Sequence, residues 1–347
     1  MVSQSVLDII MLIELGLLAL AAAVYFVHGL RLRITGGRTQ RLQKEAREAL
    51  SRILTRGNVS MRDVELLQSL PHDVQTVAFL ELSRNLSGAG KERLRFAAQR
   101  VGLIDRARSL CRHRWWTRRL RGARILSRLD VPDPLVETLL SDRHPAVRAQ
   151  AAEWAAAQPS AHVVAAMLEL LADPATQARF AVQITLLRMG SVIAAPLAFF
   201  LDTHTGRAAE AGLRVAESIA EPRFLEAALR FSREARVGIR EAAARLLGAI
   251  GGAEAAGRLT EMLRDDDAPV RAAAVSALGR MHYWQAGTLL AECLRDQRWR
   301  VRREAGLALR ALGAPGTLLL RRAVKGDDRF AADMAEQVLE LPEAAAG

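Results

Sequence analysis

The sequence is poor in cysteine and in aromatic residues, and each scarcity excludes a class of protein. Only Cys111 and Cys293 occur among 347 residues, far apart and without ligand-like spacing, so neither a disulfide framework nor a zinc site is expected. This cysteine usage fits a reducing compartment. Two tyrosines, nine phenylalanines and eleven prolines stand in a composition rich in Ala, Leu and Arg. That balance disfavours a sandwich or barrel and predicts an all-α protein.

Catalytic motifs are lacking as well. The sequence contains no HExxH, no GxSxG and no Walker-type phosphate loop. The glycines of GAIGGAEAAG, residues 248–257, fall where a repeat needs a turn. The seven histidines are scattered and have no partner at metal spacing. We therefore predict a binding protein that is not an enzyme and that uses no cofactor or metal.

One long hydrophobic run lies near the N-terminus. Residues 9–27, IIMLIELGLLALAAAVYFV, carry a single charge, and their number matches the roughly 20 residues that cross a bilayer core. No basic residue precedes the run and several arginines follow it, which argues against a cleaved signal peptide. The positive-inside rule then places the N-terminus outside and the rest of the chain in the cytoplasm. The sequence predicts a single-pass protein of the inner, cytoplasmic membrane.

The predicted span has a polar stripe. On a helix Glu14, Leu18, Ala21, Tyr25 and His28 share one face, because steps of four and three return to the same side. In one interpretation Glu14 is protonated or draws in water near the interface. In the other, Glu14, Ala21, Tyr25 and His28 contact a second transmembrane helix.

Beyond residue 90 the sequence repeats itself. Arg240, Arg271 and Arg302 lie 31 residues apart, within phrases such as MLRDDDAPVRAAAVSALG (262–279) and CLRDQRWRVRREAGLALRALG (293–313). Each repeat reads as an apolar helix, a turn holding an acid, and a second helix that often begins Val-Arg. We expect the second helices to end in a left-handed conformation at Gly190, Gly248, Gly279 and Gly313. A fixed period of this length is typical of an α-solenoid.

These repeats resemble the HEAT-repeat family, particularly its short bacterial form, over roughly residues 90–340. In that family a turn acid and a second-helix arginine form a hydrogen-bonded ladder, so the resemblance implies a structural role for the matching residues. The pairs, each six residues apart, are Asp142 with Arg148, Asp173 with Arg179, Glu234 with Arg240, Asp265 with Arg271, and Asp296 with Arg302. One repeat departs from this pattern: near Ala209, the position that the period assigns to the arginine holds another residue. The predicted organisation is a transmembrane anchor with a basic flank (1–37), a helical juxtamembrane connector (38–89) and a HEAT-like solenoid (90–347).

The stretch CRHRWWTRRLRGAR, residues 111–124, is the main candidate for a binding surface. Nine arginines and no acid lie between Arg106 and Arg128. Repeat register assigns Arg119 and Gly122 to structural positions. This leaves a surplus of Arg112, Arg114, Trp115, Trp116, Arg118, Arg121 and Arg124. These residues form an ordinary solvated face, a surface that contacts anionic phospholipid headgroups or an acidic partner, or a nucleic-acid-binding surface. Nucleic acid is the weakest of these, because the predicted anchor restricts the chain to a membrane surface.

A formal charge of +11 also points to an anionic partner. We therefore predict a membrane-anchored cytoplasmic scaffold or regulatory subunit that binds an integral membrane protein through its transmembrane helix and solenoid. A membrane-embedded glycosyltransferase is one example of such a partner. Two alternatives stay open: a HEAT-like nucleic-acid-binding protein, and a HEAT-like enzyme, since that family includes bilin lyases and alkylpurine DNA glycosylases.

Overall fold

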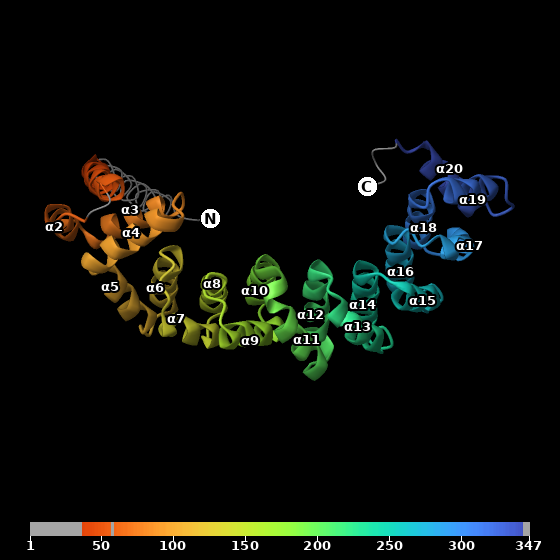
Figure 1. Ribbon diagram of the computed structural model, residues 1–347, viewed down its shortest axis with the longest axis horizontal. Coiled ribbons are helices and arrows are strands. Elements are labelled where there is room, and N and C mark those ends of the chain that lie inside the picture. Colours follow the sequence, from red (N-terminus) through yellow and green to blue (C-terminus); the bar gives the residue numbers. More distant parts are fainter. Residues whose placement is uncertain (1–36, 57–58, 343–347) are drawn as a thin grey trace, which may run out of the picture. The chain divides into compact units, whose positions relative to one another are not determined.

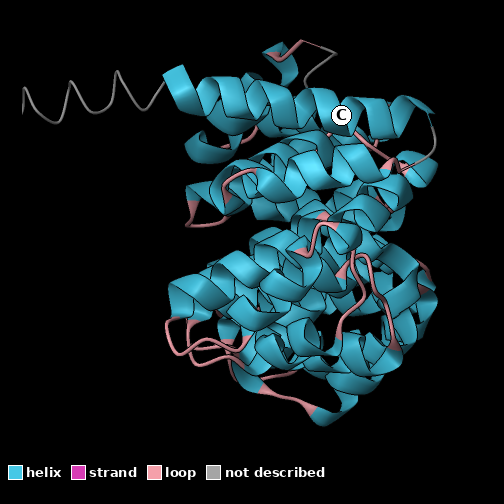
Figure 2. Ribbon diagram, turned by 90° about the vertical axis from the view of Figure 1, so that its left-hand side faces the viewer, coloured by secondary structure: helices cyan, strands magenta, loops and turns pink. Residues whose placement is uncertain are grey.

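The computed structural model describes residues 37–56 and 59–342. The predicted span, with Glu14, Ala21, Tyr25 and His28, lies outside the described residues. Within them the chain forms helices joined by short loops and no strand, as Figure 2 shows. The all-α class predicted from the composition is therefore confirmed.

The chain divides into two compact units, Met1–Val136 and Glu137–Gly347. A helix over residues 37–56 is the first described element of the first unit. It is followed by α2 (Met61–Ser69), α3 (His72–Ser83), α4 (Gly88–Arg100), α5 (Leu103–Cys111) and α6 (Trp116–Arg128). The boundary falls inside the short helix α7 (Pro134–Thr138), within the segment predicted to be one solenoid.

The second unit is a series of helical hairpins. Its first helices are α9 (Ala161–Glu169), α11 (Ala194–Thr203), α13 (Leu225–Phe231), α15 (Ala253–Met262), α17 (Gly287–Glu292) and α19 (Ala314–Val324). Its second helices are α8 (Pro145–Ala155), α10 (Thr176–Met189), α12 (Gly206–Ile219), α14 (Val237–Ile250), α16 (Ala268–Arg280), α18 (Trp299–Ala311) and α20 (Arg329–Glu340). Figure 1 shows α8, α10, α12, α14 and α16 following one another side by side. Each second helix thus covers the next, which buries a continuous core of Ala, Leu and Val side chains.

The glycines of the second helices have two different roles. Gly190 and Gly313 have positive φ angles of +59° and +72°, a region that favours glycine. Gly248 and Gly279 do not end their helices and have no positive φ, so our expectation for these two was wrong. A Cβ on Gly248 would lie 2.4 Å from the Cβ of Ala277, and Gly279 approaches α18 in the same way. These two glycines are needed because neighbouring second helices pack closely.

One described stretch, Thr176–Thr203, is long and apolar enough to cross a membrane by length and composition alone. It consists of α10, the 3-10 turn η3 (Gly190–Ile193) and α11, which belong to two successive repeats. Helix α10 packs against α8 and α11 packs against α9. Core helices of soluble proteins pass the same test, so this stretch is weak evidence for a membrane span.

Candidate interaction surfaces

A ladder of arginines joins successive repeats of the second unit. In each complete rung Nε and Nη2 of one arginine donate to the two carboxylate oxygens of an aspartate that lies 25 residues ahead. The rungs are Arg148 with Asp173 (2.5 and 2.8 Å), Arg240 with Asp265 (2.9 and 3.0 Å) and Arg271 with Asp296 (2.7 and 3.1 Å). This bidentate geometry gives strong, directional bonds.

The contact at six residues, within one repeat, is made to the main chain. Nη1 of each ladder arginine donates to the carbonyl oxygen of the turn acid. The pairs are Arg148 with Asp142 (2.6 Å), Arg179 with Asp173 (2.6 Å), Arg240 with Glu234 (2.9 Å), Arg271 with Asp265 (2.7 Å) and Arg302 with Asp296 (2.8 Å). The six-residue pairs are therefore in contact through the main chain, while the carboxylates of Asp173, Asp265 and Asp296 are bonded by the arginine of the preceding repeat.

The turn aspartates also hold the main chain just before the helices that follow them. The carboxylate of Asp296 accepts the backbone N–H of Arg298 at 2.8 Å, and Asp142, Asp173 and Asp265 accept the N–H of the residue two positions on in the same way. Burial alone would raise the pKa of Asp296, but the hydrogen bonds from Arg271 and from this N–H outweigh it and leave the pKa below its ordinary value. The rungs are thus charged at neutral pH.

Two successive rungs are missing in the middle of the second unit. The position 25 residues after Arg179 is His204, and the arginine position of the next repeat is Ala209, before Glu234. The ring of His204 stacks on that of Phe200 with centroids 4.0 Å apart, and its Nδ1 lies 3.1 Å from the Phe200 carbonyl oxygen. Among the described residues neither Arg179 nor Glu234 forms an ion pair. Helices α10 and α12 also pack less closely than the other neighbouring second helices.

The basic stretch of the first unit lies on the α5–α6 hairpin. A Cβ on Gly122 would lie 2.6 Å from the Ala107 carbonyl oxygen, so α6 packs closely against α5 at this residue. Arg119 is buried, and its Nη1 donates to the carbonyl oxygens of His113 (3.0 Å) and Arg114 (2.9 Å). Arg119 therefore holds the turn before α6, in the geometry of the ladder arginines of the second unit.

The exposed part of this hairpin forms a basic-aromatic surface, which we define as Arg112, Arg114, Trp115, Trp116 and Arg118. Trp115 is 58% exposed and Trp116 is 39% exposed. The Arg114 guanidinium lies 5.6 Å from the centroid of the Trp115 ring. The structure thus brings these five predicted residues together at the start of α6, around two large aromatic side chains that face solvent.

Two further predicted arginines, Arg121 and Arg124, are exposed farther along α6. Arg121 forms an ion pair with Asp73 at 2.6 Å, and because both side chains are exposed this pair contributes little to stability. Partial desolvation, followed by the charges of Arg118, Arg114 and Arg119, lowers the pKa of His113. Three arginines therefore lie close enough to this imidazole to contribute to the shift.

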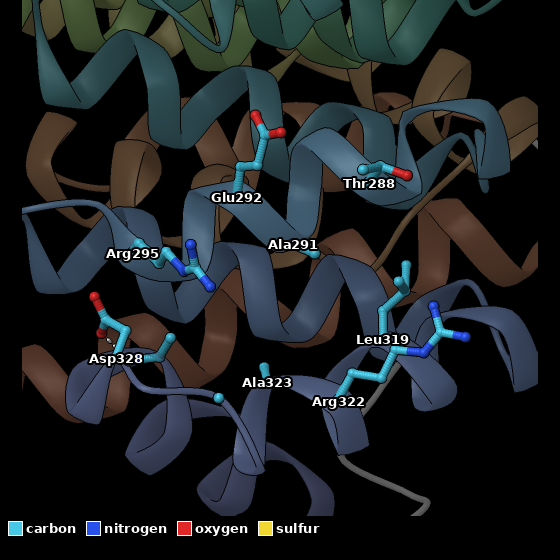
Figure 3. A pocket seen from close by; sticks show the side chains of 10 residues that line it. Thr288, Ala291, Glu292, Arg295, Leu319, Arg322, Ala323 and Asp328 are labelled. Carbon is cyan, nitrogen blue, oxygen red and sulfur yellow. Dashed lines mark hydrogen bonds between the residues drawn. The ribbon is translucent and has the colours of Figure 1, made fainter.

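A small cavity of about 230 Å³ lies between α17, α19 and α20. Figure 3 shows Glu292, Arg295, Arg322 and Asp328 around a patch that includes Ala291 and Ala323. The two acidic and two basic side chains balance, and no histidine or cysteine lines the cavity. Over residues 37–56 and 59–342 no group of three or more His, Cys, Asp or Glu residues is placed to hold a metal ion.

Comparison with known proteins identifies the repeats. The model of the family described as HEAT repeats matches residues 206–279 and 258–340, which span α12 to α20. This part of the chain therefore has the fold of an all-α HEAT-like solenoid. No curated protein matches this sequence.

Among solved structures, Kap121p bound to Nup53p is 14% identical, with a TM-score of 0.58 over 82% of this chain and 38% of that one. Importin beta is 12% identical, with a TM-score of 0.53 over 85% and 54% of the two chains. The CpcE–CpcF phycocyanin lyase complex from Nostoc sp. is 20% identical over 60% and 95%, but a TM-score of 0.37 gives it no weight. At these identities the karyopherins show the fold alone, and this chain spans only about half of their length or less.

Proposed function

We propose that the protein is a membrane-anchored scaffold or regulatory subunit whose solenoid lies in the cytoplasm and binds an integral membrane protein. The basic-aromatic surface meets an acidic surface of that partner, and anionic phospholipid headgroups share the contact. The observation that carries this proposal is the pair of exposed tryptophans, Trp115 and Trp116, among exposed arginines. A binding role, with no catalytic step, is part of the proposal.

Desolvation of aromatic surface and the attraction of opposite charges both favour this contact. Tryptophan and arginine often contribute most of the binding energy of protein interfaces. Tryptophan buries a large apolar area, and the planar guanidinium of arginine donates several hydrogen bonds. Near an anionic membrane each basic residue contributes about 1 kcal/mol, and tryptophan prefers the interfacial region. The hydrophobic run over residues 9–27 supplies the membrane attachment in this proposal. A solenoid also offers an extended surface for protein partners, and Kap121p, which shares the fold, has been solved bound to Nup53p.

The test is co-purification of the full chain from membranes in mild detergent, followed by quantitative identification of the integral membrane proteins recovered. We expect a Trp115→Ser/Trp116→Ser double variant to lose a specific membrane protein that the unchanged chain retains. The matched control is Trp284→Ser/Trp299→Ser, because these tryptophans are 68% and 58% exposed but lie in the second unit. Recovery of the same proteins by both double variants would contradict the proposal.

The same variants separate the nucleic-acid alternative. If oligonucleotides bind the full chain with a steep salt dependence, and the Trp115→Ser/Trp116→Ser variant loses that binding, the surface serves nucleic acid instead. Binding of vesicles containing phosphatidylserine, with no membrane protein recovered, would reduce the proposal to a lipid contact.

A further inference from the structure

The gap left by the two missing rungs holds a second, unexplained cluster of arginines. A cavity of about 240 Å³ there is lined by Arg179, Arg207, Arg214 and Arg236, with Glu210 as its one acidic side chain. Glu210 pairs with Arg214 at 2.8 Å. The other three arginines form no ion pair with any described carboxylate. The pocket is therefore strongly electropositive.

The local main chain adds to this positive potential. Arg207 lies in the first turn of α12, and Arg236 is the N-cap residue of α14. Thr205, the N-cap residue of α12, makes no side-chain capping bond. Helix N-termini expose unpaired N–H groups and favour negative charge. In the complete rungs an aspartate supplies that charge. Before α12 His204 occupies the aspartate position, whereas Glu234 occupies it before α14.

Arg179 is held ready for a carboxylate by its own repeat. Its Nη1 donates to the carbonyl oxygens of Asp173 (2.6 Å) and Pro174 (3.1 Å), and Nη2 donates to Thr176 Oγ1 at 3.1 Å. Arg271 makes the same main-chain bonds through Nη1 and uses its Nε and Nη2 edge for Asp296. The corresponding edge of Arg179 has its Nη2 on the Thr176 hydroxyl and forms no ion pair with a carboxylate of the described residues.

An exposed apolar stripe borders the pocket on α10. Phe180, Ile184 and Leu187 are 63%, 40% and 38% exposed, and steps of four and three place them on one helix face. Arg179 and Gln183, which line the pocket, are their neighbours in sequence and occupy the adjacent face. A free small anion has no apolar surface that could cover this stripe. A peptide with acidic and large apolar side chains complements both features.

We propose that the pocket and stripe together bind an acidic, apolar peptide segment of a partner protein, which supplies the carboxylate that the ladder lacks. The carboxylates enter the arginine pocket and the apolar side chains cover the stripe. This inference does not rest on the proposed function, because the pocket lies in the second unit and the basic-aromatic surface in the first.

The test selects peptides from a random library displayed on phage against the full chain in detergent, and measures the affinity of the selected peptide by fluorescence anisotropy. We expect enrichment of Asp and Glu beside Leu or Phe. Arg236→Glu should weaken binding by roughly tenfold or more, because it places a negative charge in the pocket that repels the carboxylates of the peptide. An acid at a helix N-terminus is favourable, so this variant should keep its thermal stability.

The matched control is Arg298→Glu, because Arg298 is the N-cap residue of α18 and the charge change is the same. Phe180→Ser tests the stripe against Phe199→Ser, whose phenylalanine is 71% exposed elsewhere. Equal binding to Arg236→Glu and Arg298→Glu would overturn the inference. So would a selected sequence without acids, no enrichment at all, or displacement of the peptide by free citrate or phosphate at an equal concentration.

Discussion

Breaking one rung of the ladder should destabilise the second unit measurably. Arg271→Met removes a guanidinium that is 17% exposed and leaves the Asp296 carboxylate, 12% exposed, with only the Arg298 N–H as a donor. Removing one partner of a fully buried pair costs about 3 to 5 kcal/mol. Because some solvent reaches this rung, we expect about 3 kcal/mol, near the lower end. The control is Arg303, which is 50% exposed beside Glu304 and lies 5.9 Å from the centroid of the Trp299 ring; Arg303→Met should cost less than about 1 kcal/mol.

The assay is urea unfolding followed by helical circular dichroism, combined with amide hydrogen exchange, because a repeat protein can open in parts. Exchange should accelerate mainly in α16 and α18, the helices that this rung joins. A double-mutant cycle with Asp296→Asn isolates the pair, and the double variant should lose less than the sum of the single losses. Equal costs for Arg271→Met and Arg303→Met would refute the reasoning.

Three further predictions follow from packing and ionisation. Gly279→Ala should cost about 1 to 3 kcal/mol, because the new Cβ would lie 2.6 Å from the Cβ of Ala308 in α18. Gly257→Ala should instead stabilise the protein by about 0.5 to 1 kcal/mol, because its Cβ would have no atom within 4 Å. Urea unfolding midpoints measure both changes. Burial opposes ionisation of Asp296, but the arginine hydrogen bond outweighs it and lowers its pKa. The contribution of Asp296 to the free energy of unfolding should therefore be fully present above its unfolded pKa of about 4 and be lost as the pH drops below it. The free energy of unfolding of Asp296→Asn should fall less steeply over the same pH range. Burial raises the pKa of Cys111 to about 12 and that of Cys293 to about 11, so both thiols should react slowly with a disulfide reagent at about pH 8 until urea unfolds the chain; fast reaction beforehand would contradict this.

The hairpins were predictable from the sequence, but the partners of the ladder residues were not. Helix, turn and second helix follow from local periodicity, which the period of 31 residues reinforces. Asp265, however, lies six residues before Arg271 and 25 residues after Arg240. Neighbouring helices pack about 8 to 10 Å apart, within the reach of an arginine, so spacing along the chain does not choose between the two. In the structure the carboxylate of Asp265 accepts from Arg240, and its main-chain carbonyl oxygen accepts from Arg271.

The roles of the glycines show the same limit. A glycine near the end of a predicted helix is equally compatible with a left-handed cap and with a close helix contact. One signal was present: Gly248 and Ala277, like Gly279 and Ala308, are 29 residues apart, and each pair meets in space. The exposure of Trp115 is another property that periodicity does not give, because it depends on which face of α6 the α5 helix covers.

An unpaired ladder arginine is not by itself a binding site, as the C-terminal end of the ladder shows. Asp327 lies 25 residues after Arg302 but forms no ion pair with it among the described residues, and the Nε of Arg302 is buried without an acceptor. There the Phe330 ring lies 5.0 Å from the guanidinium and covers it within the chain. At Arg179 no described aromatic ring takes that place, and further arginines converge instead. Arg302→Met should therefore leave binding of the selected acidic peptide unchanged, whereas Arg236→Glu should weaken it; a loss in both would mean that the peptide follows net charge and not the pocket.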